Sequence, residues 1–389
     1  MAAWAMACGL LLFWAVVCTV SFFGWRNVRT LPNAAEAKER LPLVSVIVAA
    51  KEEAENIAAT VRSLMGQKLA RMELIVVNDR SRDATGVRAE LLKKEFALRE
   101  KPPFPLKTVH ITALPEGWLG KNYALYQGYL QARGSMLLFA DADVRFDRDV
   151  VKDALAYMSA QQIDHLTLIP DLQAEGFWLK AFVRYFLFSL SLVRPPWLAN
   201  MDKQKKYGFG VGAFNLMKRS VYEAIGTHKA IAMRPDDDLE LGMRIKQGGY
   251  RQRVMTGTGR LEVKWYNSLA EAFQGLEKNL FAGFRYNPLL AFIAVSMQLM
   301  LGVLPFAGLF SPDLPLAIVS LAAVVLFAGA YLFAAGRISQ DKPWDVLVLP
   351  VSALLVAYAI ARSACLAVLR GGIYWRGTFY PLRELRRKF

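Results

Sequence analysis

Long apolar runs near both ends of the chain enclose a middle region of mixed character. Residues 3–24 are almost wholly apolar. Three further apolar stretches lie toward the other end, at about 288–310, 314–336 and 346–368. About twenty consecutive apolar residues are enough for a helix to cross the hydrocarbon core of a bilayer. The pattern therefore predicts an amino-terminal anchor over 1–25 and carboxyl-terminal membrane helices over 288–368.

The middle region alternates short apolar runs with segments of helical spacing. Strands are expected at 44–48, 73–77, 107–111 and 136–140. Helices are expected between and after them, at 53–66, 85–98, 122–132 and 149–160. This alternation is typical of a doubly wound, mainly parallel sheet, which binds ligands beyond the carboxyl ends of its strands. We therefore expect one α/β domain over 42–286, with its site at that edge.

Residues 177–199 mix aromatic side chains with Lys180, Arg184 and Arg194. Two interpretations are open: a helix buried beneath the sheet, or a helix lying in the plane of the membrane surface. Aromatic and basic side chains together favour the second, because they suit the boundary between headgroups and acyl chains.

The charge balance favours anionic partners. The 389 residues are 54% hydrophobic and 21% charged, with a formal net charge of +15. The strongest basic run lies beside the membrane segments and comprises Arg370, Arg376, Arg383, Arg386, Arg387 and Lys388, against Glu384 alone. Basic clusters beside membrane segments contact acidic headgroups and mark the cytoplasmic side. We therefore expect a membrane partner, no nucleic acid, and a basic cytoplasmic tail over 369–389.

The orientation of the segments poses a conflict. Arg26 and Arg29 follow the first apolar run and no basic residue precedes it, as in an uncleaved anchor whose carboxyl-terminal end is cytoplasmic. This orientation predicts a multi-pass protein of the cell membrane whose catalytic domain is cytoplasmic. Three later crossings, however, would place the basic tail outside. One explanation is that an apolar segment is re-entrant or in-plane, and Pro350 makes the last segment, at 346–368, the first candidate. The other is that the assumed orientation of the amino terminus is wrong.

The three cysteines, Cys8, Cys18 and Cys365, all lie in apolar stretches without metal-ligand spacing. We interpret them as small buried hydrophobic residues, with no disulfide framework and no zinc site.

Acidic residues follow three of the predicted strands. Asp141 and Asp143 come after the fourth strand, where two carboxylates can hold Mg²⁺ or Mn²⁺. Asp79 ends the second strand and Glu53 follows the first. Each alone is also typical of an ordinary surface turn or helix cap. Their recurrence at one sheet edge favours a binding site.

Two further segments carry candidate chemistry. Lys121 follows a glycine-containing loop before a helix, where a lysine suits a diphosphate, although a solvated loop lysine has the same pattern. Asp236, Asp237 and Asp238 stand together before another helical segment. Crowded carboxylates raise one another's pKa, which suits a general base, while acids also favour helix amino termini. Of the histidines, we interpret His110 and His165 as structural.

Together these segments resemble the family 2 glycosyltransferases of the GT-A fold. The resemblance covers about 43–286 and rests on five motifs in order: VSVIVAAKEEAENI at 44–57, IVVNDRSRDAT at 75–85, GKNYAL at 120–125, FADAD at 139–143 and DDLEL at 237–241. The glycine-rich GFGVGAFNLMKR at 208–219 resembles the family's segment before the acceptor site. Asn78 replaces the family's first acid, and Ala49 to Glu52 depart from its usual proline and Arg-Asn.

The resemblance implies a role for each candidate. Asp79 and Glu53 are expected at the nucleoside, Lys121 and Asp141 at the diphosphate, and Asp141 and Asp143 at Mg²⁺ or Mn²⁺. Asp238 is expected to be the catalytic base with Asp237 beside it. The implied fold is a GT-A nucleotide-sugar domain, with a doubly wound, mixed but mainly parallel sheet, between amino- and carboxyl-terminal transmembrane helices.

The implied reaction is inverting, metal-dependent transfer of one sugar from a nucleotide diphosphate sugar, a UDP-sugar by family default, to a lipid acceptor. The arrangement of anchors resembles that of bacterial hopanoid, carotenoid and ceramide glycosyltransferases. GLEKNLF at 275–281 stands where processive synthases have Q-x-x-R-W, which favours non-processive transfer. Two alternatives stay open: a nucleotidyltransferase, and a non-catalytic membrane scaffold that binds sugar nucleotides.

Overall fold

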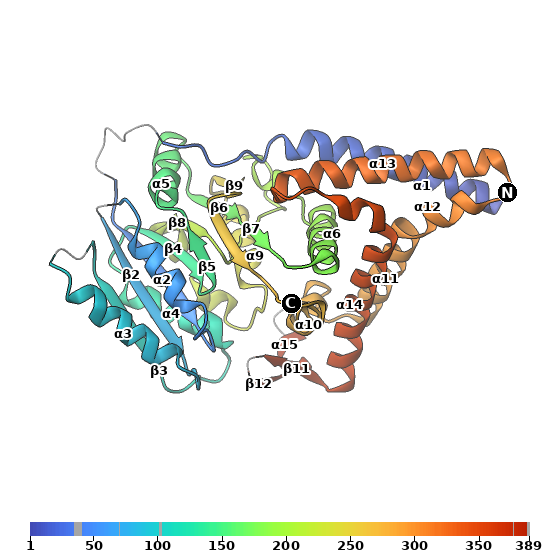
Figure 1. Cartoon of the computed structure of the whole chain (residues 1–389). Coiled ribbons are helices and arrows are strands. Elements are labelled where there is room, and N and C mark those ends of the chain that lie inside the picture. Colours follow the sequence, from blue (N-terminus) through green and yellow to red (C-terminus); the bar gives the residue numbers. More distant parts are fainter. Residues whose placement is uncertain (35–40, 70, 101–102, 376, 387–389) are drawn as a thin grey trace. The chain divides into compact units, whose positions relative to one another are not determined.

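The structure is a computed structural model that describes residues 1–34, 41–69, 71–100, 103–375 and 377–386. Arg376, Arg387 and Lys388 of the predicted basic tail lie outside these residues. The chain divides into two compact units (Figure 1). The sheet unit comprises Val28–Gln173 and Pro196–Lys264, and the helical unit comprises Met1–Asn27, Ala174–Pro195 and Trp265–Phe389.

A seven-stranded sheet forms the centre of the sheet unit, with strand order β3-β2-β1-β4-β8-β6-β9. Its strands are β1 (Val44–Ala50), β2 (Met72–Asp79), β3 (Leu106–Ile111), β4 (Met136–Asp141), β6 (His165–Ile169), β8 (Asn215–Lys218) and β9 (Gln252–Thr256). Strands β1 to β4 are parallel and β6 is parallel to β9, whereas β8 runs antiparallel to both of its neighbours. The predicted mixed, mainly parallel sheet is confirmed.

Helices and a second, small sheet complete the unit. The helices are α2 (Ile57–Met65), α3 (Thr85–Ala97), α4 (Gly120–Gln131), α5 (Val150–Ala160), α7 (Pro196–Ala199), α8 (Arg219–Ala224), η1 (His228–Ile231) and α9 (Asp237–Gln247). The small sheet has the order β5 (Val144–Phe146), β10 (Leu261–Lys264), β7 (Asp171–Gln173). Helix α2 begins at Ile57 and not at the predicted residue 53. The backbone amide of Glu53 donates to Thr85, the first residue of α3, and that of Ala54 donates to Asp83 in the loop before α3, which holds this stretch outside the helix.

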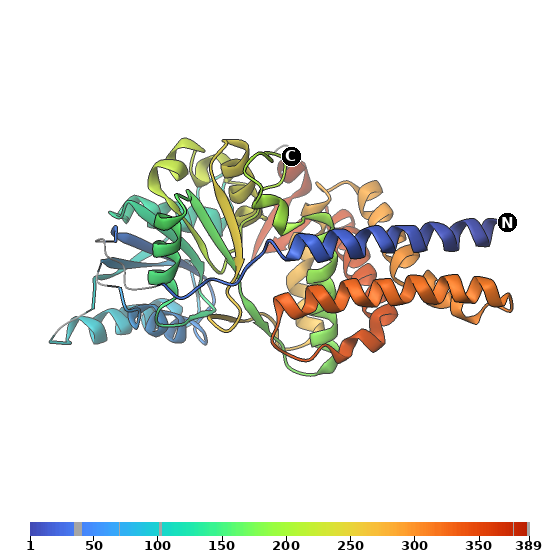
Figure 2. The ribbon, with the colours of Figure 1, turned by 90° about the horizontal axis from the view of Figure 1, so that it is seen from above.

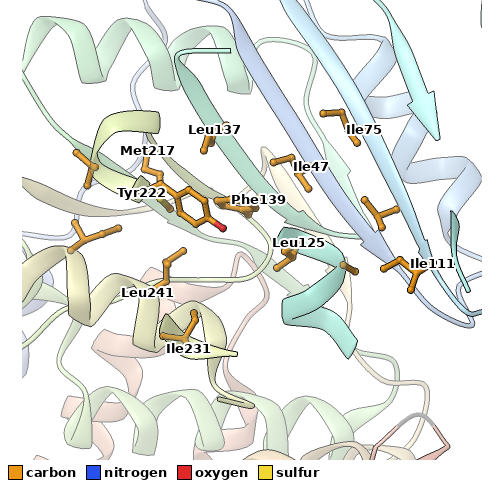
Figure 3. Close-up of a cluster of buried hydrophobic side chains, with 14 residues drawn as sticks. Ile47, Ile75, Ile111, Leu125, Leu137, Phe139, Met217, Tyr222, Ile231 and Leu241 are labelled. Carbon is orange, nitrogen blue, oxygen red and sulfur yellow. The ribbon is translucent and has the colours of Figure 1, made fainter. Parts of the chain in front are cut away.

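One buried cluster joins the sheet to the helices near its carboxyl edge (Figure 3). Ile47 and Phe139 come from strands, and Leu125 and Leu241 pack against them from α4 and α9. Strands β1 and β2 are buried along most of their length, as expected for strands covered on both faces. The cluster fixes α4 and α9 on the part of the sheet that carries the candidate residues.

The helical unit holds the apolar segments. Its elements are α1 (Ala2–Trp25), α6 (Phe177–Val193), α10 (Leu269–Gly283), α11 (Pro288–Gly302), α12 (Leu304–Ala307), η2 (Gly308–Phe310), α13 (Leu314–Ile338), η3 (Trp344–Val348), α14 (Leu349–Leu369), β11 (Gly372–Trp375), β12 (Thr378–Pro381) and α15 (Leu382–Arg386). Four segments are long and apolar enough to cross a membrane: Ala2–Trp25, Pro288–Phe310, Leu314–Ile338 and Trp344–Leu369. Transmembrane helices at both ends of the chain were predicted, and these four agree with that prediction.

Helices α1 and α13 lie side by side along their whole length (Figures 1 and 2). Trp14 of α1 stacks on Phe327 of α13 with ring centroids 4.1 Å apart, and its indole N–H donates to the Leu301 carbonyl. Aromatic stacking and this one buried hydrogen bond join three apolar segments at one point.

The aromatic segment at 177–199 is not one helix. Helix α6 ends at Val193, and Pro195 separates it from the short α7, because a proline disfavours helical backbone at the residue before it. Helix α6 belongs to the helical unit, where it packs on α13 and α14. Its placement in the membrane plane stays a prediction.

The prediction of buried cysteines was wrong for Cys8 and Cys365, which are exposed on the outer faces of α1 and α14. Cys18 is partly exposed, and all three are free thiols. An apolar sequence gives no sign of which helix face packs inward when both faces are apolar.

Candidate active site

The loops that follow β1 and β2 turn sharply at the carboxyl edge of the sheet. Glu52 and Arg80 stand directly after these strands with φ of 54° and 53°. Left-handed backbone is uncommon for residues other than glycine and clusters at functional sites. The Glu52 carboxylate accepts from the Arg82 amide at 2.9 Å, so the two turns hold one another.

Asp79 is buried at the end of β2. Its carboxylate receives two hydrogen bonds from the guanidinium of Arg80, at 2.7 and 3.2 Å. Gly120 lies directly against it, because a Cβ atom at that position would overlap the Asp79 carboxylate. The close approach places the amino terminus of α4, and with it Lys121, beside Asp79.

Glu53 lies on the loop after β1. Its amide donates to the Thr85 hydroxyl at 2.8 Å, and its carboxylate accepts from Asn56 at 3.0 Å. Glu53 is thus tied to the start of α3, and it is not among the described residues that line the pocket below.

Lys121 lies between carboxylates from two different elements. Its Nζ is 2.8 Å from Asp141 Oδ1, at the end of β4, and 3.4 Å from Asp237 Oδ2, in the first turn of α9. Burial alone would lower the pKa of Lys121, but Asp141, Asp237 and Asp238 outweigh it and raise that pKa above its ordinary value. Lys121 is therefore a permanent cation at this point.

A small pocket surrounds these groups. Its polar lining comprises Lys121, Asp141, Gly212, Asn215, His228, Asp237 and Asp238. Four of the predicted site residues thus meet in one place: Lys121, Asp141, Asp237 and Asp238. Asp143 lies in the turn just after β4 and is not among the described residues of that lining.

Asp238 is oriented by backbone amides. Its Oδ2 accepts from the Gly212 amide and its Oδ1 from the Leu239 amide, both at 2.8 Å. Gly212 also leaves room for the Asp141 carboxylate and for Lys121, since a Cβ atom there would lie 3.2 Å from Lys121 Nζ. The glycine-rich segment thereby brings the backbone to both carboxylates at once.

Burial raises the pKa of Asp237 and of Asp238, and the neighbouring carboxylates act in the same direction while Lys121 opposes them. The Asp236 carboxylate is paired with Arg234, whose guanidinium donates to it at 2.9 and 2.8 Å. Of the three adjacent acids, Asp236 is paired with an arginine, whereas Asp237 and Asp238 line the pocket. Raised carboxyl pKa values in a pocket are typical of acid–base sites.

The donor set suits a hard divalent cation bound together with a ligand. Asp141 and Asp143 offer carboxylate oxygens from a single turn, which Mg²⁺ and Mn²⁺ prefer. Within the described ranges, no group of three or more His, Cys, Asp or Glu side chains could hold a metal alone. Mg²⁺ is commonly bound by one or two carboxylates plus substrate phosphates, so the prediction of a divalent cation at Asp141 and Asp143 stays a prediction.

Asn122 was not predicted, and it is fully buried at the start of α4. Its amide nitrogen donates to the carbonyls of Ile231, Ala232 and Arg234, at 2.8, 3.1 and 2.9 Å. These carbonyls lie on the connection that leads into α9. Asn122 thus links α4, which carries Lys121, to α9, which carries Asp237 and Asp238. Asn122 directly follows the Gly120-Lys121 motif in the sequence.

A second buried network holds the glycine-rich segment against α9. The Gln252 carboxamide accepts from the Phe209 amide at 2.9 Å and donates to the Gly242 carbonyl at 3.0 Å. The same nitrogen donates to His165 Nδ1 at 2.7 Å, and His165 Nε2 faces Asn215 Oδ1. Burial lowers the pKa of His165 to about 4, so the ring is neutral near pH 7. His165 thus has structural contacts, as predicted, but they lie directly beneath the pocket.

Comparisons with known proteins bear on the family and the fold of the chain. Residues 45–226 match the family model of glycosyl transferase family 2. A mannosyltransferase from Pyrobaculum calidifontis, solved in complex with GDP-Man and Mn²⁺, has a similar fold, with a TM-score of 0.54 and 18% identity over 93% of this chain and 98% of that one. This similarity confirms the predicted GT-A type of fold.

Two curated relatives match part of the chain. The 4,4'-diaponeurosporenoate glycosyltransferase of Staphylococcus haemolyticus is 25% identical over 245 residues, which are 62% of this chain and 61% of that protein. The probable glycosyltransferase YdaM of Bacillus subtilis is 28% identical over 233 residues, 58% of this chain and 51% of that one. The matches therefore span about half to three-fifths of these relatives. This chain carries a family 2 glycosyltransferase domain, and residues 45–226 belong to that family.

Proposed function

We propose that this chain transfers a single sugar from a nucleotide diphosphate sugar to a hydroxyl group of a lipid. The observation that carries the proposal is the pocket in which Lys121, Asp141, Asp237 and Asp238 converge at the carboxyl edge of the sheet. A cation beside a carboxylate pair can hold a diphosphate, and an oriented carboxylate of raised pKa can accept a proton. Both are needed when a hydroxyl displaces a nucleoside diphosphate.

Asp238 is the proposed general base. Two backbone amides fix its carboxylate, and burial raises its pKa, so that proton acceptance from the acceptor hydroxyl is favoured. The attack inverts the anomeric carbon if the hydroxyl approaches opposite the leaving diphosphate. Asp237 holds Lys121 from the other side and is proposed to fix the charge beside the base.

Lys121 and the strand-end acids are proposed to bind the donor. Lys121 would contact the diphosphate, while Asp79 and Glu53 would hold the nucleoside through the loops they organise. Asp141 and Asp143 would hold Mg²⁺ or Mn²⁺, which supplies positive charge for the leaving diphosphate. The P. calidifontis mannosyltransferase was solved with GDP-Man and Mn²⁺, so GDP-sugars belong in the assay beside UDP-sugars.

The lipid acceptor is proposed on two grounds. The part of the chain that the structure describes has four apolar helices that could cross a membrane, and the S. haemolyticus relative is named a 4,4'-diaponeurosporenoate glycosyltransferase, which has a lipid-like acceptor. The catalytic domain is proposed to be cytoplasmic, because Arg26 and Arg29 follow the first apolar helix.

The test is transfer of labelled sugar from UDP- and GDP-sugars to extracted lipids, in membranes that contain the chain or its Asp238→Asn variant. General-base help is worth about 10²–10⁴-fold, so Asp238→Asn should lose at least about 100-fold in transfer. Donor binding, measured by titration, should persist. The matched control is Asp202→Asn, which removes an exposed carboxylate that pairs with Arg253.

Full transfer by Asp238→Asn would remove Asp238 from the role of base. Release of pyrophosphate in place of nucleoside diphosphate would indicate a nucleotidyltransferase. Donor binding without any turnover by the parent chain would indicate a scaffold.

A further inference from the structure

Chain connectivity assigns two helices of the helical unit, α6 and α10, to the same side of a membrane as the sheet unit. The first part of the sheet unit ends at Gln173, and α6 follows it in the chain. The chain re-enters the sheet unit at Pro196. Seventeen helical residues span about 25 Å, too little to cross a bilayer and return. Helix α10 follows Lys264 and carries Glu271 and Glu277, which are unsuited to hydrocarbon. Both helices are therefore assigned to the same side of the membrane as the sheet unit.

The start of α14 is bonded to α6. Asp345, in the turn that leads into α14, is 2% exposed and accepts from Arg184 Nη1 at 2.8 Å. The Tyr331 hydroxyl also donates to Asp345, and the Lys342 carbonyl accepts from Arg184 at 3.2 Å. A buried ion pair with these supporting bonds fixes the first residues of α14 beside α6.

The second half of α14 is bonded to α10. Arg362 Nη2 lies 2.6 Å from Glu277 Oε1, and the Ser363 hydroxyl donates to the Glu277 carbonyl at 2.5 Å. Arg370, just after the helix, lies 3.4 Å from the same carboxylate. Arg362 is the fourteenth of 21 residues in α14, a depth at which a crossing helix would place this pair in the hydrocarbon core.

The segment after α14 returns to the foot of α11. The Arg386 guanidinium donates to the Tyr286 carbonyl at 3.0 Å, two residues before α11 begins at Pro288. Helix α11 starts shortly after α10, and therefore on the same side of the membrane as the sheet unit. Both ends of α14 therefore lie on one side, which a helix of about 31 Å that crossed the bilayer could not achieve.

An apolar stripe runs along the outer face of α14. Val351, Leu354 and Tyr358 are 38, 46 and 50% exposed and recur at helical spacing, and Val368 continues them at 47%. Leu347 of η3, just before the helix, is 77% exposed. The opposite face, with Ala353, Val356 and Ile360, is buried. Figure 1 shows α14 running across the direction of α1 and α13. A helix across two membrane-spanning helices presents such a stripe to acyl chains beneath the headgroups.

We propose that α14 lies in the membrane interface and does not cross. The chain then crosses the bilayer three times, with α1, the Pro288–Phe310 segment and α13. The basic residues after α14 lie on the same side as the sheet unit, which removes the conflict between the apolar segments and the basic tail. The occupant of the α14 stripe is the acyl-chain layer of that leaflet.

The test is cysteine labelling of the full chain in cells, with an impermeant maleimide applied before and after permeabilisation. Native cysteines are first replaced (Cys8→Ala, Cys18→Ala, Cys365→Ala). Single cysteines are then introduced on exposed residues: Gln161→Cys in the sheet unit, Pro312→Cys before α13, Gln340→Cys before α14 and Glu384→Cys after it. Elution of each variant as a single species from a gel-filtration column controls for folding.

The cysteines at 161, 340 and 384 should label together, and only after permeabilisation, while that at 312 should label in intact cells. Labelling of 340 and 384 from opposite sides would overturn the proposal, as would labelling of 312 and 340 from the same side. The experiment uses neither donor nor acceptor, so its outcome is independent of whether the proposed sugar transfer is correct.

Discussion

At the scale of single residues, a cluster of charged side chains lies beside a buried network of neutral side chains. Lys121 and its three carboxylates form a charged cluster that faces the pocket. Directly behind it, His165, Gln252 and Asn215 form a buried network of neutral groups. A buried polar network rigidifies its surroundings only while every member stays satisfied. The neutrality of His165 is therefore a condition for the position of the glycine-rich segment.

This condition predicts a pH dependence of stability. The folded-state pKa of His165 is about 4, whereas an unfolded histidine titrates near about 6.5. Between these values the unfolded chain binds a proton that the folded chain excludes, so the free energy of unfolding falls as the pH falls. From pH 7.5 to 5.5 the loss attributable to His165 is roughly 1 kcal/mol.

His165→Gln keeps a donor and an acceptor but does not titrate. In detergent, the variant should lose less stability than the parent chain between pH 7.5 and 5.5, measured by thermal or urea unfolding. His228, whose pKa burial lowers to about 3, contributes to the remaining slope in both proteins. Identical slopes in variant and parent would contradict the assignment of a neutral, buried His165.

At the scale of elements, the site depends on how α4 and α9 are held together. Lys121 comes from the first turn of α4, and Asp237 and Asp238 from the first turn of α9. The sheet positions α4 through apolar packing, as the strand and helix pattern predicts. The connection to α9 instead depends on the three hydrogen bonds of Asn122, whose partners are 109 to 112 residues away.

Asn122→Asp tests this link. The change keeps the shape of the side chain but turns an oxygen toward three carbonyl oxygens, so buried acceptors lose their donor. The free energy of unfolding should fall by at least about 2 kcal/mol. The kcat of sugar transfer should fall more than the donor KM changes, because the α9 carboxylates lose their position.

Asn33→Asp is the matched control, since it makes the same chemical change at an exposed position. It should leave unfolding and kcat as in the parent chain. A variant at Asn122 with parental kcat and reduced stability would limit Asn122 to a structural role.

Local pattern predicted most elements of the sheet unit, because buried strands and amphipathic helices repeat with fixed periods. Motif order also selected Asp79, Asp141 and Asp238, of which the structure places Asp141 and Asp238 in one pocket, while their roles stay predictions. The sequence pattern missed the start of α2, which side chains at and just before the start of α3 decide, and it missed Asn122, Arg80 and Gln252. These residues act through partners distant in sequence or through backbone atoms, which leave no periodic signal.

At the scale of the whole molecule, the helical unit is assembled from three separate stretches of chain. The Arg184–Asp345 pair joins the second stretch to the third, with side chains that are 7 and 2% exposed. Removing one partner of a buried pair leaves an uncompensated charge, which typically costs about 3–5 kcal/mol, whereas replacing both with apolar groups is often near neutral.

Arg184→Met alone should therefore lower the unfolding temperature of the full chain in detergent by several degrees. The double variant Arg184→Met with Asp345→Leu should recover most of that loss. A double variant less stable than Arg184→Met would show that the two changes add, and that the pair is not coupled.

The interruption of the sheet unit by Ala174–Pro195 has a consequence for biosynthesis. Strand β8 pairs with both β4 and β6, yet it is synthesised after α6. When Asn215 is synthesised, β1 to β4, β6 and α6 have already been made, and β8 must pair between two earlier strands. Because β8 and β9 both follow α6 in the chain, the sheet can be completed only after α6 has been synthesised. The carboxylates of α9 also follow α6, so the pocket can be assembled only after that helix has been made.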